Sequence, residues 1–188
     1  MKNFTRLLGL CISLLLFAGF SFGQSFVQFG TGNVESSLPF YTSWKYAYTS
    51  TIYTKDEVGS AKTITAIAFN NNFTDLAALG FDFDMPNQKI YMKHVSQSEW
   101  SDMSYENPTA NGYTLVWQGT VHYGALGWNV ITFTTPFAYN GTDNLVIHWE
   151  NGSGTSTYSL KNAATTIGKK QVKCNGADAG GVPTTAGF

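Results

Sequence analysis

The sequence predicts an all-β protein, an antiparallel two-sheet β-sandwich of jelly-roll-like form. Charged residues make up only 12% of the chain, whereas 15% are aromatic and 19 are glycine, a composition typical of strands and turns rather than helices. Short segments in which apolar and polar residues alternate recur between turn residues. No connection is long and helical enough to cross over between parallel strands, so antiparallel pairing is favoured.

The expected strands are spaced regularly, with turn residues between them. They lie at residues 25–29, 46–53, 63–69, 88–95, 113–123, 128–134, 144–150 and 155–161. Residues 63–69 are apolar on both sides, as in a central strand that is buried on both faces. Two helical turns are also expected: one at residues 54–58, capped by Thr54 and ended by Gly59, and one at residues 97–103.

Alternation within the strands predicts which side chains share a face. In residues 144–150, one face carries Leu145, Ile147 and Trp149, and the other carries Val146, His148 and Glu150. Large apolar side chains fill the space between two sheets, so the expected core includes Trp117, Trp128, Phe133 and Trp149.

The first 23 residues have the three-part pattern of a secretory signal peptide. Lys2 and Arg6 form a short positive head, residues 7–20 are an apolar run without charge, and Ser21 and Gly23 are small residues placed for cleavage. The apolar run is too short for a stable membrane span. We therefore expect a protein that is secreted or held at the cell surface, with no transmembrane span in the mature chain.

The mature chain is expected to form one domain over residues 24–175. Residues 176–188 are a Gly- and Ala-rich tail, interpreted as a last edge strand or the start of a linker. Residues 1–23 contain two of the basic residues and no acidic one, so the mature chain is mildly acidic, and its longest basic run is Lys169-Lys170. Nucleic acid binding needs a dense positive surface, so this composition argues against it.

Seven segments resemble the N-terminal β-sandwich module of secreted surface proteins from Bacteroidetes-type bacteria. They read LPFY at residues 38–41, TIYTKDEVG at 51–59, KTITAIAF at 62–69, KIYMKH at 89–94, YTLVWQGTV at 113–121, GWNVITFTTPF at 127–137 and YNGTDNLVI at 139–147. The resemblance implies adhesion or accessory binding outside the cell, either as a monomer or as part of a longer chain with a type IX sorting domain after Phe188. It implies no catalytic residues.

The residues that could carry chemistry form no complete motif. Asp82 and Asp84 alternate with phenylalanines, so their carboxylates share one side and could seed a structural Ca²⁺ site, the alternative being a solvated acidic loop. The three histidines do not have the spacing of zinc ligands and are expected to lie apart. Cys174 is the only cysteine after the signal peptide and is expected as an exposed thiol, unpaired or in an intermolecular disulfide. No hydrolase or phosphate-loop motif is present, so an enzyme is not expected.

Aromatic residues outside the expected strands are the more informative signal. Trp44 and Tyr46 lie in a cluster before or at the start of the second strand, and Trp100 and Tyr105 lie in a polar loop. Such rings can stack on sugars or anchor protein partners, or they can cover the core. We therefore expect a non-catalytic binding or adhesion module that contacts a glycan or a surface protein through these four residues. The alternatives are a structural spacer domain and a small secreted hydrolase.

Overall fold

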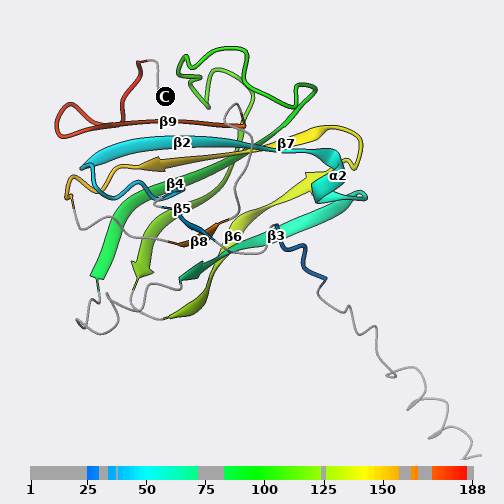
Figure 1. The fold of residues 1–188 in the computed structure, drawn as a ribbon, viewed down its shortest axis with the longest axis horizontal. Coiled ribbons are helices and arrows are strands. Elements are labelled where there is room, and N and C mark those ends of the chain that lie inside the picture. Colours follow the sequence, from blue (N-terminus) through cyan, green and yellow to red (C-terminus); the bar gives the residue numbers. More distant parts are fainter. Residues whose placement is uncertain are drawn as a thin grey trace, which may run out of the picture.

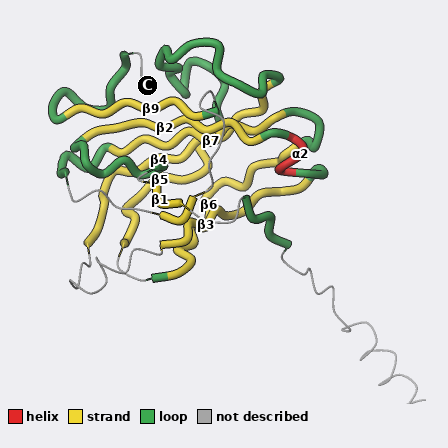
Figure 2. The backbone as a smooth tube through the Cα atoms, in the orientation of Figure 1, coloured by secondary structure: helices red, strands yellow, loops and turns green. Residues whose placement is uncertain are grey.

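The computed structural model describes residues 25–29, 34–36, 38–71, 83–123, 126–156, 162–164 and 171–185. Strands form most of this part of the chain, and the sheets are antiparallel and stacked in two layers (Figures 1 and 2). The predicted all-β sandwich is confirmed. Its jelly-roll-like connectivity stays a prediction, and the expected signal peptide lies outside the described residues.

The larger layer is a five-stranded sheet with the order β5-β4-β7-β2-β9. Its strands are β2 (Tyr46–Tyr53), β4 (Phe83–Val95), β5 (Thr114–Tyr123), β7 (Asn144–Asn151) and β9 (Val172–Ala177). The second layer is built on the pair β3 (Lys62–Asn71) and β6 (Gly127–Tyr139). A short pair, β1 (Val34–Ser36) with β8 (Asn162–Ala164), completes the strands, and β8 lies close to β3.

Local sequence signals are borne out unevenly. The helical turn α2 (Lys55–Val58) is present, with a reciprocal capping box between Thr54 and Glu57 and with Gly59 at its end at φ 81°. The turn expected at residues 97–103 is wrong, because that stretch is irregular. The strand expected at residues 25–29 is also absent. The last strand, β9, covers Val172–Ala177 and so lies almost wholly before the tail of residues 176–188, for which an edge strand or the start of a linker was expected. Among the described residues, no helix has the length and apolar character needed to span a membrane.

The main core lies between the two layers. On the five-stranded sheet, the core consists of the side chains that point toward the second layer, such as Leu145 and Trp149. On the second layer it includes Ile131 and Phe133. Phe40, from the segment before β2, inserts between the layers and meets Trp149 edge-on, with 4.9 Å between the ring centroids. Each large apolar side chain buried here contributes about 1.5–3 kcal/mol, so this core is the main source of the fold's stability.

Candidate functional site

The face of the five-stranded sheet that points away from the core is buried, yet it is polar and aromatic. Strand register places Tyr91 of β4, His148 of β7, Ser50 of β2 and Lys173 of β9 opposite one another in one row. All four side chains are buried; the residue exposure is 1% for Ser50 and 0% for His148. The next row along the strands contains Lys89, Glu150, Tyr48 and Asn175. Two adjacent rows of polar and tyrosine side chains are therefore brought together by strand pairing.

Residues 96–113, which connect β4 to β5, cover this face; we call them the cover segment (Figure 1). Trp100 is only 5% exposed, and its Nε1 donates a hydrogen bond to the Ser50 carbonyl at 3.3 Å. The Lys173 ammonium lies 3.7 Å from the centroid of the Trp100 ring and donates to the Ser104 carbonyl at 2.8 Å. The Tyr105 hydroxyl donates to Glu150 Oε1 at 3.1 Å. The cover segment thus contacts three strands of the sheet.

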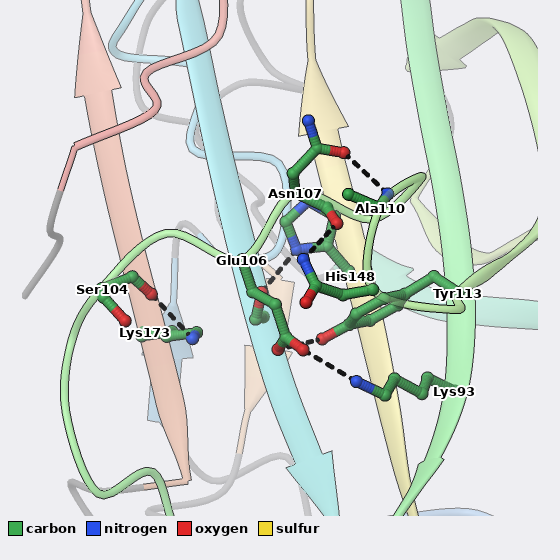
Figure 3. Close-up of polar contacts among 10 residues, drawn as sticks. Lys93, Ser104, Glu106, Asn107, Ala110, Tyr113, His148 and Lys173 are labelled. Atoms are coloured by element: carbon green, nitrogen blue, oxygen red, sulfur yellow. Dashed lines mark hydrogen bonds and ion pairs between the residues drawn. The ribbon is translucent and has the colours of Figure 1, made fainter.

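Glu106 is the strongest charged contact of the cover segment. Its carboxylate accepts from Lys93 Nζ at 2.7 Å and from the Tyr113 hydroxyl at 2.9 Å, as Figure 3 shows. Burial by itself would raise the pKa of Glu106, but the hydrogen bonds from Lys93 and Tyr113 outweigh it, so the pKa is lowered. Burial and the adjacent Glu106 raise the pKa of Tyr113. Glu106 is therefore held as a carboxylate and Tyr113 as a neutral donor.

His148 lies at the centre of the cluster. Its Nδ1 is 2.5 Å from Ser50 Oγ, and its Nε2 is 3.6 Å from Glu150 Oε1. The second separation is too long for a hydrogen bond, so we take it as an electrostatic contact, and Nε2 has no hydrogen-bond partner in the described part of the chain. The ring is surrounded by four tyrosines at centroid distances of 5.8–6.2 Å, namely Tyr48, Tyr91, Tyr105 and Tyr113.

The charged groups of the cluster are tuned by burial and by one another. Burial would raise the pKa of Glu150, but His148, Tyr105 and Lys89 lower it overall. Burial lowers the pKa of Lys173, although Glu106 and Asp102 oppose the shift. Burial is also the largest cause that raises the pKa of Tyr48 and Tyr91 to about 12. Both tyrosines therefore stay neutral at ordinary pH and can donate hydrogen bonds.

Ser50, His148 and Glu150 contain the groups of an acyl-transfer relay, in which a base activates a hydroxyl and a carboxylate orients the base. Their burial prevents a substrate from reaching the Ser50 hydroxyl in this conformation. Hydrogen-bond reach alone does not make a nucleophile without access to the reacting carbon. In this conformation, the hydrogen bonds of the cluster hold its own side chains in place.

The structure brings together two of the four aromatic residues that the sequence suggested for ligand binding. Trp100 and Tyr105 both lie in the cover segment, where Trp100 is a buried covering residue. Trp44 and Tyr46 lie elsewhere, at the start of β2, and both are partly exposed. The Trp44 ring packs so closely over Gly176 that a Cβ there would lie 2.2 Å from it. The position of the Trp44 ring therefore requires a glycine at residue 176 in β9.

Of the two candidate Ca²⁺ ligands, only Asp84 lies in a described element, at the start of β4. Asp82 is outside the described residues, and Asp84 is exposed, with its Oδ1 2.9 Å from Nδ1 of His122 on β5. Within the described ranges, no three His, Cys, Asp or Glu residues lie close enough together to hold a metal ion. A Ca²⁺ site at this position stays a prediction.

Cys174 differs from its expected exposed position. It lies on β9 as a free thiol that is partly buried, and burial raises its pKa. A raised pKa leaves less thiolate at neutral pH, so the thiol is less reactive than an exposed cysteine would be.

The outward face of β3 and β6 carries the aromatic residue that sequence reasoning placed wrongly. Trp128 is 55% exposed and is therefore not a core residue, whereas Phe133 and Trp149 are buried and Trp117 packs against the core as expected. Val130, on the same face, is 63% exposed. The alternation along β6 could have placed Trp128, because it puts Trp128 on the opposite face of the strand from Ile131 and Phe133.

No family model, no curated protein and no solved structure matches the chain. The function is therefore inferred from the residues and their geometry.

Proposed function

We propose that the protein is a secreted, non-catalytic binding module whose ligand is a surface glycan. The observation that carries this proposal is the exposed Trp128 ring on the outward face of β6. A flat indole ring offers a large, rigid apolar surface at low entropic cost, and the C–H face of a sugar ring can stack on it. Exposed apolar groups gathered on a sheet face are typical of interaction sites.

The neighbours of Trp128 favour a sugar over an apolar protein surface. Asn70 stands opposite Trp128 across the β3–β6 ladder, and Thr132 is exposed on the same face of β6. Amide and hydroxyl groups can exchange hydrogen bonds with sugar hydroxyls on either side of a stacked ring. Leu126 and Val130 enlarge the apolar part of the surface. A ring flanked by neutral polar groups suits a ligand that is apolar on one face and hydroxylated at its edge.

The non-catalytic part of the proposal is supported by the burial of Ser50, which carries the only hydroxyl of the Ser50, His148 and Glu150 group and is 1% exposed. An extracellular location is supported by the signal-peptide pattern of residues 1–23, and adhesion or accessory binding by the resemblance to secreted surface modules. Together these observations favour a protein that attaches to extracellular carbohydrate without changing it.

The test is binding of the purified secreted chain to an immobilised glycan array, for wild type and for Trp128→Ala. We expect wild type to retain one class of glycan and Trp128→Ala to bind it at least about tenfold more weakly, since stacking on the ring is lost. Trp44→Ala is the matched control, because Trp44 packs against β9 rather than on the β6 face, and it should bind as wild type does. Glycan binding that is equal in wild type and Trp128→Ala, or no glycan binding at all, would contradict the proposal.

A further inference from the structure

The cover segment is attached to the sheet in two different ways. At its ends, Trp100 and Tyr113 pack into a small apolar cluster with Ile52, Val95 and Val146. Between these anchors, residues 101–112 have no regular secondary structure, and most of their contacts with the sheet are polar. The exception is the Tyr105 ring, which meets the Tyr48 ring edge-on with 5.1 Å between the centroids. A segment with fixed ends and a polar, irregular middle has the build of a compact surface loop that opens locally.

We propose that residues 101–112, which we call the lid, close a carbohydrate-binding site whose floor is Tyr48, Tyr91, His148, Glu150 and Lys173. This site is distinct from the Trp128 face, on the other layer of the sandwich. Its aromatic walls and few polar groups have the composition of small-molecule sites.

The lid presents to the floor the same groups that a sugar would present. The Tyr105 hydroxyl donates to the Glu150 carboxylate, and the Ser104 carbonyl accepts from the Lys173 ammonium. Each sugar hydroxyl can donate to a carboxylate and accept from an ammonium, so one ligand can replace both lid contacts. The lid therefore competes with the ligand for the same two charged groups.

His148 supplies an independent sign that the floor is made for a ligand. Its Nε2 is fully buried and has no hydrogen-bond partner among the described residues, although it points toward the Glu150 carboxylate. Leaving a buried polar atom unpaired is unfavourable, and such atoms are rare in native proteins. A ligand hydroxyl to one side of Nε2 and Glu150, within hydrogen-bond reach of each, would satisfy both groups.

The charges of the site favour a neutral ligand. Three lysines and three acidic residues lie on the floor, on the lid or beside the floor on β4, so the formal net charge of the group is zero: Lys89, Lys93 and Lys173 with Asp102, Glu106 and Glu150. An anionic or cationic ligand would leave one sign of charge unbalanced in a buried site, which is costly. A polyhydroxyl ligand such as a sugar pairs with both signs without adding charge.

The experiment is calorimetric titration of the full secreted chain with glucose, galactose, mannose, N-acetylglucosamine and their β-linked disaccharides. Tyr105→Phe keeps the ring but removes the lid's hydroxyl, so closure is weakened, and we expect about tenfold tighter binding of the sugar that binds wild type. Glu150→Gln removes a floor charge, so we expect at least tenfold weaker binding. Tyr41→Phe is the control and should bind as wild type does, since the Tyr41 ring packs against Trp44 before β2 and takes part in none of the lid contacts described above.

Amide hydrogen exchange gives a second readout and checks folding. Both Tyr105→Phe and Glu150→Gln should speed exchange in residues 101–112 while protection in β7 is kept, because each removes a lid contact. The two variants should therefore agree in lid exchange and disagree in sugar affinity. A lid with a purely structural role would change exchange without any sugar binding. If none of these sugars binds to either wild type or Tyr105→Phe, the proposal is overturned.

Trp128→Ala separates this site from the proposed function. It should leave titration of the soluble sugar and lid exchange unchanged, because Trp128 lies on the other layer. Loss of array binding in Trp128→Ala with intact calorimetric binding supports two sites. Loss of both in Trp128→Ala would overturn the lid site.

Discussion

The two outward faces of the sandwich have opposite characters. On the five-stranded sheet, polar residues such as His148 and Ser50 are buried, whereas on the β3–β6 sheet Trp128 and Val130 are exposed. In a simple sandwich, the outward faces carry polar residues exposed to water, and the apolar residues are covered. Each outward face of this protein departs from that arrangement. The difference comes from the cover segment, which lies over one face only. Burial on an outward face therefore depends on what packs above it and not on the hydrophobicity of its strands.

The two faces therefore differ in what they contribute to stability and to ligand binding. The covered face has fixed hydrogen bonds whose loss leaves buried groups unpaired, so it contributes to stability as well as to the proposed lid site. On the exposed face, more than half of Trp128 and of Val130 is in water, so these side chains contribute less to folding and can contact a ligand. The following changes test this contrast, from the largest expected effect to the smallest.

His148→Ala should destabilise the fold by about 3 kcal/mol. The change opens a cavity among four tyrosines and leaves the buried Ser50 hydroxyl without its partner. Urea unfolding followed by tryptophan fluorescence measures the loss. His122→Ala, at an exposed histidine, should stay within about 0.5 kcal/mol of wild type. Equal losses in the two variants would show that the covered face is no more important to stability than the exposed surface.

Acid should weaken the covered face before the rest of the fold. The pKa values of Glu106 and Glu150 are lowered in the folded protein from the ordinary value of 4.5. Their contribution is therefore fully present above pH 4.5 and is lost as the pH falls through the lowered values. Unfolding free energies measured between pH 6 and pH 2 should decrease over the acid part of this range, and the decrease should be smaller in Glu106→Gln. An equal pH dependence in Glu106→Gln would contradict the assignment.

Tyr113→Phe should cost roughly 1.5 kcal/mol, because it removes a hydrogen bond to a carboxylate while keeping the ring in the apolar cluster. Thermal unfolding of wild type and Tyr113→Phe measures this loss of stability. Tyr46→Phe serves as the matched control, because Tyr46 is partly exposed and lies at the sheet's end. A cost below that of Tyr46→Phe would mean that Glu106 does not hold the cover segment.

Trp128→Ser should change the free energy of unfolding by only about 0.5 kcal/mol or less, since more than half of the residue is already in water. Chemical unfolding gives this value, and Trp149→Ala provides the contrast, with an expected loss of about 3–5 kcal/mol at a fully buried ring. A large loss at Trp128 would place it in the stability core and remove the contrast between the two faces.

The local part of the fold could be predicted from the residues alone. Alternation placed Leu145 and Trp149 on one face of β7 and His148 on the other, because successive side chains in a strand point to opposite sides. The α2 turn was equally local, since Thr54 and Gly59 satisfy its ends within a few residues. The candidate site was predicted only in fragments: Trp100 and Tyr105 were identified, but their partners on the sheet were not.

By itself, the sequence determined a β-sandwich and the residues that share each strand face, because these depend on short-range patterns. Only the tertiary structure decided which of the two faces is covered. Its contacts join Tyr105 to Glu150 and Ser104 to Lys173, pairs that are 45 and 69 residues apart, beyond the reach of any local pattern. The same cause explains two of the errors of prediction. Trp100 packs on the sheet in place of a helical turn, and Trp128 is exposed because nothing described packs over β6 at that point.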